Sequence, residues 1–284
     1  MSQSFSSPSP MQPLSIGNVV TAGLRIYRSH LKSYFLLALK AYLWILVPVY
    51  GWAKFYAICG LLSRLAFGEL VNQPESIEAG SRYVNSKLWQ FLVTFLLMFL
   101  IGVGIFICFV ILVAFFAAIF AGLAAVANIP IVLGFTVPTI LLIVVSALVP
   151  IIIMLWLITR FFVVVVPLAI EENVNGSSTI NRSWNLTKGY VWRISVIIFV
   201  AFLITLPIEI ASEVVNRIIE TTLSIFLQQD SSELNLLGLL ITLSLTLLTG
   251  AVVMPFWQAI KAVLYYDIRT RREGLGLKLR DRNI

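Results

Sequence analysis

The run from Leu88 to Thr159 contains no Asp, Glu, Lys, Arg or His, and it limits the possible folds more than any other feature of the sequence. In a soluble domain roughly a quarter of the residues are charged, which keeps the surface in water. In this chain only 12% of the residues are charged and 60% are hydrophobic. A helix of about 20 apolar residues crosses a bilayer while satisfying its own backbone hydrogen bonds. The sequence therefore predicts an all-α, polytopic transmembrane bundle.

Basic residues gather at the ends of the apolar runs, in clusters that contain Arg25, Arg82, Arg182 and Arg269. Cytoplasmic loops carry an excess of Lys and Arg, so all four clusters are expected on the cytoplasmic side. Each interval between clusters must then hold an even number of crossings. We expect about six crossings, with both ends of the chain in the cytoplasm. The apolar runs are Tyr34–Phe67, Leu88–Ala127, Ile131–Leu168, Ile194–Ile208 and Leu234–Ile260.

Turn signals divide these intervals into helices. Asn128-Ile-Pro130 splits the uncharged stretch into two long helices. Pro48-Val-Tyr-Gly51 is expected to turn the first run into a hairpin, although a kinked single helix or a re-entrant segment is the alternative there. In the third interval we expect a short crossing, Trp192–Ile208, then a polar amphipathic segment, Glu209–Asp230, along the far surface, and then a final long crossing.

Three short segments that precede the crossings have the pattern of basic amphipathic helices at a membrane interface. In Ser15–Lys32 one helical face is apolar and the other is polar or basic. Ser76–Lys87 aligns with it, and Ser178–Arg193 follows the pattern more loosely. The chain is then either a threefold repeat of an elbow helix and a membrane hairpin, or three independent elbows that share a basic interface. The apolar face of the first elbow contains Ile16, Val19, Gly23, Tyr27 and Leu31, and the opposite face contains Asn18, Thr21, Arg25, Arg28 and Lys32.

The remaining composition places both tails and both cysteines. Residues 1–13 are rich in Ser and Pro and lack the pattern of a signal peptide, so we expect a cytoplasmic tail. Residues 14–275 form one transmembrane domain, and 276–284 form a basic cytoplasmic tail. Cys59 and Cys108 lie in apolar stretches and are expected to behave as small hydrophobes. The net charge of +7 is explained by basic residues beside the membrane, so we expect no nucleic-acid partner.

The motifs of enzymes are missing from the sequence. His30 is the one histidine, which excludes His pairs and the metalloprotease helix motif. The chain has neither a Gly-x-Ser-x-Gly elbow nor a Gly-rich phosphate loop with its Lys. Glu171 and Glu172 are adjacent, and adjacent residues on a helix point in different directions. We therefore predict no enzyme, no catalytic residue, no cofactor and no metal site.

Cations near the apolar runs are the candidate contacts for lipid headgroups or ions, because charge in hydrocarbon is costly. Anchoring is the simpler reading, since long Lys and Arg side chains reach the headgroups from within the bilayer. Lys54 fits anchoring least well, because it follows the expected hairpin turn. The candidates are Arg25, Arg28, Lys32, Lys40, Lys54, Arg82, Arg182, Lys188 and Lys261.

Three stretches carry a resemblance to a known family: Leu24–Arg28, Ser183–Arg193 and Ala262–Leu275. They resemble the membrane domain of the glycerophosphoryl diester phosphodiesterase membrane-domain family. The resemblance implies a bacterial multi-pass protein of the inner membrane or of an internal membrane such as the thylakoid. In some members a soluble phosphodiesterase barrel follows this domain. This chain has no room for that barrel and lacks its catalytic His and Glu positions, so the activity is not expected here.

Two functions are consistent with these features. The first is a non-catalytic scaffold, assembly factor or accessory subunit that contacts anionic lipid and other integral membrane proteins. It follows from the basic elbows, the long apolar helices and the missing catalytic motifs. The second is a transporter or lipid-handling protein, favoured by the repeat-like elbows, the lysines near the membrane and the Pro and Gly interruptions of the helices.

Overall fold

A computed structural model describes residues 14–126, 137–226 and 232–274. Every regular element within these ranges is an α-helix, which confirms the predicted all-helical class. The two tails and the expected turn at Asn128–Pro130 lie outside the described residues. The helices are α1 (Ile16–Ser29), α2 (Leu31–Ile45), α3 (Tyr50–Leu70), α4 (Ile77–Ser86), α5 (Leu88–Val126), α6 (Val137–Phe161), α7 (Val165–Ile170), α8 (Ser178–Thr187), α9 (Val191–Phe226) and α10 (Ser232–Glu273).

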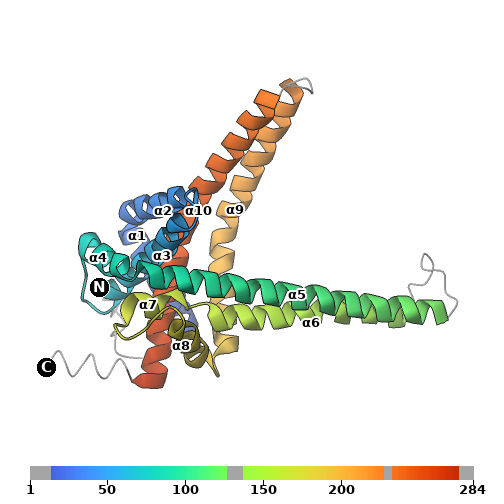
Figure 1. Ribbon diagram of the computed structural model, residues 1–284, viewed down its shortest axis with the longest axis horizontal. Coiled ribbons are helices and arrows are strands. Elements are labelled where there is room, and N and C mark those ends of the chain that lie inside the picture. The colour runs from blue at the N-terminus through green and yellow to red at the C-terminus, as the bar shows by residue number, and fades with distance from the viewer. Residues whose placement is uncertain (1–13, 127–136, 227–231, 275–284) are drawn as a thin grey trace, which may run out of the picture.

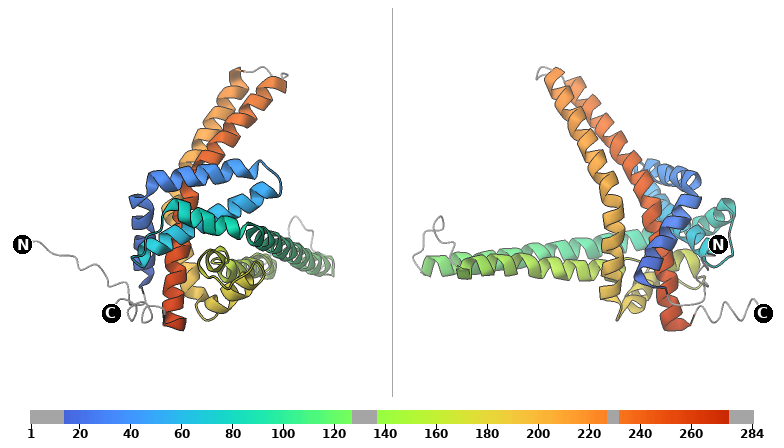
Figure 2. Two further views of the ribbon diagram at one scale, coloured as in Figure 1. Left: turned by 60° about the vertical axis from the view of Figure 1, so that its left-hand side comes forward. Right: turned by 180° about the vertical axis from the view of Figure 1, so that it is seen from behind.

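Two long helical hairpins dominate the molecule and diverge from a common base (Figures 1 and 2). One consists of α5 and α6, and the other consists of α9 and α10. The helices α1, α3, α4, α7 and α8 and the C-terminal third of α10 pack together at that base, which we call the hub. Within the described residues, four helices are long and apolar enough to cross a membrane. Their apolar spans are 88–119, 151–170, 191–222 and 238–273.

A third, shorter hairpin, α2–α3, packs between the bases of the two long ones. Helix α3 contacts both α10 and α5, and α2 contacts α10. The chain turns between Ile45 and Tyr50, where Val49 has a φ of 60°, so the turn expected at residues 48–51 is confirmed. Gly51 is required there, because a Cβ atom would lie 1.8 Å from the Trp44 carbonyl oxygen. Helix α2, with 15 residues, is shorter than the roughly 20 residues that a crossing needs.

Helices α1 and α4 match the first two predicted elbows, whereas the third, Ser178–Arg193, is divided between α8 and the start of α9. The Ser15 hydroxyl caps α1 by accepting a hydrogen bond from the Asn18 amide, and the Ser76 hydroxyl caps α4 in the same way. Val19, Gly23 and Tyr27 are buried as the amphipathic pattern predicted. Leu31 is 50% exposed, against the prediction, because α1 ends at Ser29 and α2 starts in a new direction.

We had expected the apolar run 131–168 to form one helix up to its end, and the structure shows that it does not. Helix α6 ends at Phe161, and the short buried helix α7 follows after a turn. The carbonyl groups freed by this break receive hydrogen bonds from α8. The Thr179 hydroxyl donates to the Val164 carbonyl at 2.6 Å, and the Ser183 hydroxyl donates to the Arg160 carbonyl at 2.8 Å. Because these hydroxyls bond the two carbonyl groups, the helix can break inside the hub without leaving those buried carbonyls unpaired.

The expectation for 209–230 is also wrong in the residues that are described, because α9 continues through Pro207 to Phe226 as one helix. The polar half of α9 runs beside α10 instead of lying apart along a surface (Figure 1). The Ser212 and Thr249 hydroxyls are hydrogen-bonded across the pair at 2.7 Å. Arg217 forms exposed ion pairs with Glu213 and Glu220 at helical spacing, which favours the continued helix.

Candidate functional site

Among the contacts that join the hub in the described part of the chain are three groups of ionic and polar contacts, and the most deeply buried of the three is centred on Asp267 of α10. This carboxylate has no exposed surface. It accepts hydrogen bonds from the Leu14 amide at 2.8 Å, from Arg193 at 2.9 Å and from Arg271 at 3.1 Å. Arg193 and Arg271 also donate to the Leu14 carbonyl. Asp267 thus joins the start of α1, the base of α9 and the end of α10.

The second group is centred on Glu171, which follows α7. Arg182 of α8 bonds Glu171 at 3.0 Å and Glu273 at 2.6 Å, and the Tyr265 hydroxyl donates to Glu171. Burial lowers the pKa of the Arg182 guanidinium, but its hydrogen bonds to the two carboxylates outweigh burial and raise that pKa above its ordinary value. Arg182 therefore stays charged at any physiological pH and ties α8 to α10.

The third group fastens α3 and α4 to the residues around α7. The Arg64 guanidinium bonds Glu75 at 2.6 Å, donates to the Ala169 carbonyl at 2.8 Å and lies 3.9 Å from the centre of the Tyr83 ring. The Lys87 ammonium, at the start of α5, donates to the Glu171 carbonyl at 2.8 Å. The bases of both long hairpins are thus bonded to the same small helices. This arrangement fixes the directions in which the hairpins leave the hub.

No family model, no curated protein and no solved structure matches this chain. The resemblance drawn from Leu24–Arg28, Ser183–Arg193 and Ala262–Leu275 therefore stays a prediction. The structure gives two of these stretches structural roles, since Arg193 and Asp267 form the buried ion pair. The function has to be argued from the geometry of the chain itself.

The predicted headgroup contacts fall into two groups in the structure. Most are exposed, and within the described residues their side chains have no hydrogen bond or ion pair. These cations are free to meet lipid headgroups, as the anchoring interpretation requires. They lie on several helices and do not converge on one point. They are Arg25, Arg28, Lys32, Lys40, Arg82 and Lys188.

Three predicted contacts are engaged within the chain. Arg182 is held by the two carboxylates described above. The Lys54 ammonium donates to the Asn85 side chain of α4 at 2.8 Å, so it lies beside an elbow helix. Lys261 is partly buried, with its ammonium 5.4 Å from the centre of the Phe162 ring. Lys54 is therefore explained without a site in the membrane, which the sequence alone did not show.

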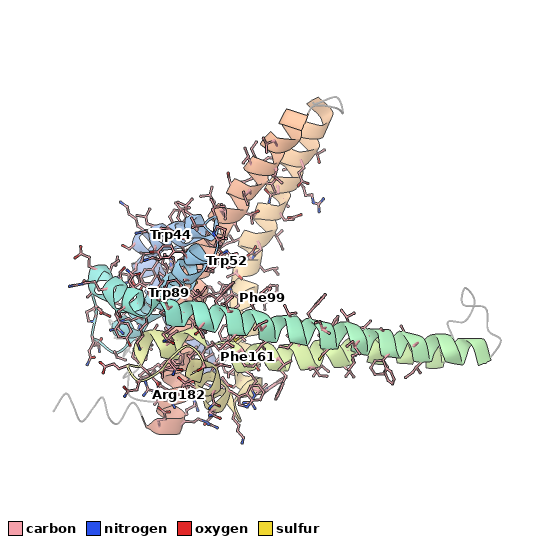
Figure 3. All side chains as sticks on the ribbon, viewed as in Figure 1. Trp44, Trp52, Trp89, Phe99, Phe161 and Arg182 are labelled. Atoms are coloured by element: carbon pink, nitrogen blue, oxygen red, sulfur yellow. The ribbon has the colours of Figure 1, made fainter. Side chains whose placement is uncertain are left out.

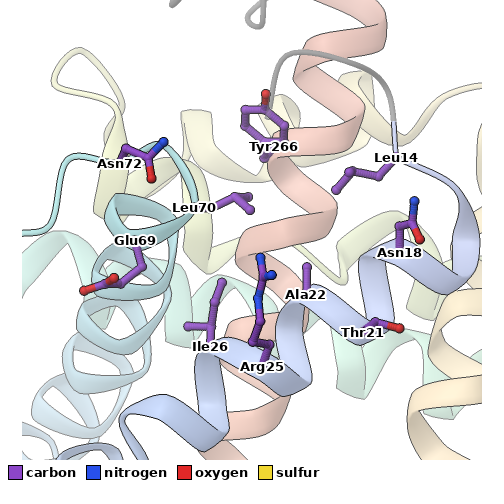
Figure 4. A pocket seen from close by; sticks show the side chains of 10 residues that line it. All are labelled: Leu14, Asn18, Thr21, Ala22, Arg25, Ile26, Glu69, Leu70, Asn72 and Tyr266. Atoms are coloured by element: carbon purple, nitrogen blue, oxygen red, sulfur yellow. The ribbon is translucent and has the colours of Figure 1, made fainter. Parts of the chain in front are cut away.

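An open cavity lies between α1, the C-terminal end of α3 and α10 (Figure 4). Its volume is about 320 Å³. Apolar side chains, among them Leu14, Ile26 and Tyr266, form its buried wall. Asn18, Thr21 and Arg25 of α1 line its exposed side. Of the sequence-predicted contacts, Arg25 is the one that this cavity includes.

The second notable surface is the α5–α6 hairpin. The first residues of α5, among them Phe91 and Leu92, pack into the hub, but the most apolar 18-residue stretch of this helix contains no buried residue. Figure 3 shows side chains of both helices extending away from the pair, with no other helix beside them beyond the hub and the base of α9. Phe106, Ile111 and Phe115 are each more than 60% exposed. Such a surface requires lipid or another protein to cover it.

Sequence reasoning missed the residues that hold the hub together. Asp267 and Arg271 stand four residues apart on one helix, a spacing from which their ion pair could have been proposed. The pairing of Arg193 with Asp267, and of Arg182 with Glu171 and Glu273, had no such local signal. We had expected Arg182 to contact a lipid headgroup or an ion, and we had treated Arg193 only as a marker of the cytoplasmic side.

Proposed function

We propose that this protein is a non-catalytic membrane scaffold or assembly subunit, in which the hub holds two membrane hairpins apart and α5–α6 binds another integral membrane protein. The length of α5 is the observation that carries this proposal. Its 39 residues contain no charge, and at 1.5 Å per residue they extend about 58 Å. The hydrocarbon core of a bilayer is only about 30 Å thick.

The excess length has to be sheltered from water. For α5 to fit within the hydrocarbon by tilting alone, its axis would have to lie about 60° from the bilayer normal. Transmembrane helices tilt by about 20° on average and by up to about 40°. A tilt in that range leaves part of the apolar hairpin outside the hydrocarbon. A partner protein that covers the end of the hairpin removes this cost.

Helix α9 of the other long hairpin does not pose the same problem. The apolar part of α9, from Val191 to Ile208, is about 27 Å long, close to the bilayer thickness. Beyond it, Glu209, Glu213 and Arg217 make the helix polar enough for water. The excess apolar length of α5 is therefore not shared by α9.

Our preferred topology has four membrane crossings instead of six. In it the α2–α3 hairpin does not cross the bilayer but enters the interface and returns to the same side, as in the re-entrant alternative. Three facts support it: α2 is short, the tip residues Leu46 and Val49 are exposed and apolar, and Lys54 reaches the elbow helix α4. An even number of crossings also fits the contact of Leu14 with Asp267, which places the start of α1 beside the end of α10. We propose that this side faces the cytoplasm of a bacterial inner or internal membrane, as the basic residues suggest.

The experiment that tests the scaffold proposal is purification of the full chain from its native membrane in a mild detergent. We expect a second integral membrane protein to copurify at a fixed ratio to this chain. If the chain runs alone, the scaffold proposal fails. The alternative function, transport, was favoured in part by lysines near the membrane. The hydrogen bond of Lys54 to Asn85 gives that function no specific support.

A further inference from the structure

The cavity between α1, α3 and α10 has the chemistry of an anion site. Figure 4 shows the Arg25 side chain directed into the cavity, and the Glu69 carboxylate directed away from it. Glu69 also lines the cavity, and its carboxylate lies 3.5 Å from the His30 ring nitrogen. Arg25 has no carboxylate within ion-pair distance in the described chain. Arg25 is thus the cation that lines the cavity, and no ion pair within the described chain occupies its guanidinium.

Two neutral carboxamides also line the cavity, one on either side of this guanidinium (Figure 4). The Asn18 and Asn72 side chains line the cavity, and neither amide has a hydrogen-bond partner among residues 14–126, 137–226 and 232–274. Asn72 is held at the end of α3 with a φ of 56°, a left-handed conformation that asparagine tolerates better than most residues. Two carboxamides and a fork of guanidinium N–H groups are donors suited to a phosphate group.

The position and size of the cavity also fit a headgroup. It opens along the exposed face of α1, the elbow that we place at the membrane interface. Its volume of about 320 Å³ is at the small end of the range for ligand pockets, roughly 300 to 1,000 Å³. The wall that includes the buried Leu14 and Ile26 and the half-buried Leu70 is apolar and can pack against the glycerol and upper acyl carbons of a lipid.

We infer that this cavity binds a phosphate group, supplied by an anionic phospholipid or by a soluble phosphate, with Arg25 as the charged contact and Asn18 and Asn72 as neutral donors. The inference rests on the proposed membrane setting, but not on the partner of α5–α6. A site of this kind differs from general attraction to anionic lipid, because binding depends on Arg25 and not on all basic residues of α1. Arg28, one turn along α1, is exposed and does not line the cavity.

The test compares wild type, Arg25→Gln, Arg28→Gln and Asn18→Ala, each as the full chain in nanodiscs of phosphatidylglycerol and phosphatidylcholine. Native mass spectrometry counts the phosphatidylglycerol molecules that stay bound after release from the disc. We expect Arg25→Gln to reduce retention about tenfold or more, since hydrogen bonds to charged groups are the stronger kind. Asn18→Ala should reduce it less, and Arg28→Gln should match wild type. Equal losses in Arg25→Gln and Arg28→Gln would instead mean diffuse attraction and would overturn the site.

A second measurement distinguishes the source of the phosphate. Inorganic phosphate is added to lipid-free protein in a neutral detergent, and thermal unfolding is followed for wild type and Arg25→Gln. Stabilisation of wild type alone supports a soluble phosphate, whereas lipid retention without this stabilisation supports a headgroup. If Arg25→Gln changes neither response, the site is refuted. Copurification of a membrane protein with Arg25→Gln is scored separately, so the scaffold proposal and this site can fail independently.

Discussion

Asp267→Asn is expected to lower the free energy of unfolding by about 3 kcal/mol or more, the range for breaking a buried ion pair. The carboxylate has no exposed surface and receives hydrogen bonds from α1, α9 and α10. Asparagine lacks the charge and cannot satisfy both Arg193 and Arg271, so two cations would be left near an uncharged side chain. We expect this loss to loosen the base of the α9–α10 hairpin.

Thermal unfolding in detergent, followed by tryptophan fluorescence, measures this loss. Glu213→Gln is the matched control, because its ion pair with Arg217 is exposed, with 61% and 73% of the two side chains accessible. An exposed pair contributes at most about 1 kcal/mol. The double variant Asp267→Asn with Arg193→Met should lose less unfolding free energy than the sum of the losses in the two single variants, because the two residues are in contact. Equal effects of Asp267→Asn and Glu213→Gln would show that the buried cluster does not hold the hub.

Replacing Ile111 and Phe115 together by Ala should release the partner of α5–α6 without unfolding the chain. The two residues are four positions apart on one face of α5, and each is 61% exposed. They lie beyond the first 30 Å of the helix, in the part that an upright bilayer crossing does not cover. Loss of packing by two large side chains should weaken partner binding about tenfold, or about 1.4 kcal/mol.

Quantitative copurification with wild type and variant measures this effect. The control is Phe199→Ala with Leu203→Ala on α9, a pair with the same spacing and with 59% and 46% exposure. Those residues lie in the apolar segment that matches the bilayer, where lipid is the expected neighbour. Both double variants should unfold at the wild-type temperature. If the α5 and α9 double variants retain the partner equally, the interface does not include the face of α5 that contains Ile111 and Phe115.

Local patterns were enough to predict the helices and several of their ends. The amphipathic faces of α1 and α4, and the Pro and Gly residues between α2 and α3, depend on residues close together in the chain. The paths of α6 and α9 were missed because distant partners decide them. Thr179 and Ser183 supply hydrogen bonds that allow the break after α6. Thr249 pairs with Ser212 in the polar segment that we had expected to lie apart from the crossings.

The candidate site was predictable only in part, for the same reason. The pattern of α1 identified Arg25 as a basic residue at the interface. The cavity that receives its side chain requires α3 and α10, which no spacing in the sequence brings beside α1. The membrane class followed from the uncharged run itself. The threefold repeat remains a prediction, although Gly23 and Gly80, aligned between the first two elbows, each lie against a neighbouring helix too closely for a Cβ atom.

The most direct test of the scaffold is photo-crosslinking in the native membrane, with a photoreactive amino acid placed at position 115 or at position 199. Both side chains are exposed on long apolar helices. If α5–α6 binds a partner, position 115 should give a discrete protein adduct that matches the copurified subunit, while position 199 should give lipid adducts. Lipid adducts alone at both positions would contradict the account, because the excess length of α5 would then have no protein to cover it.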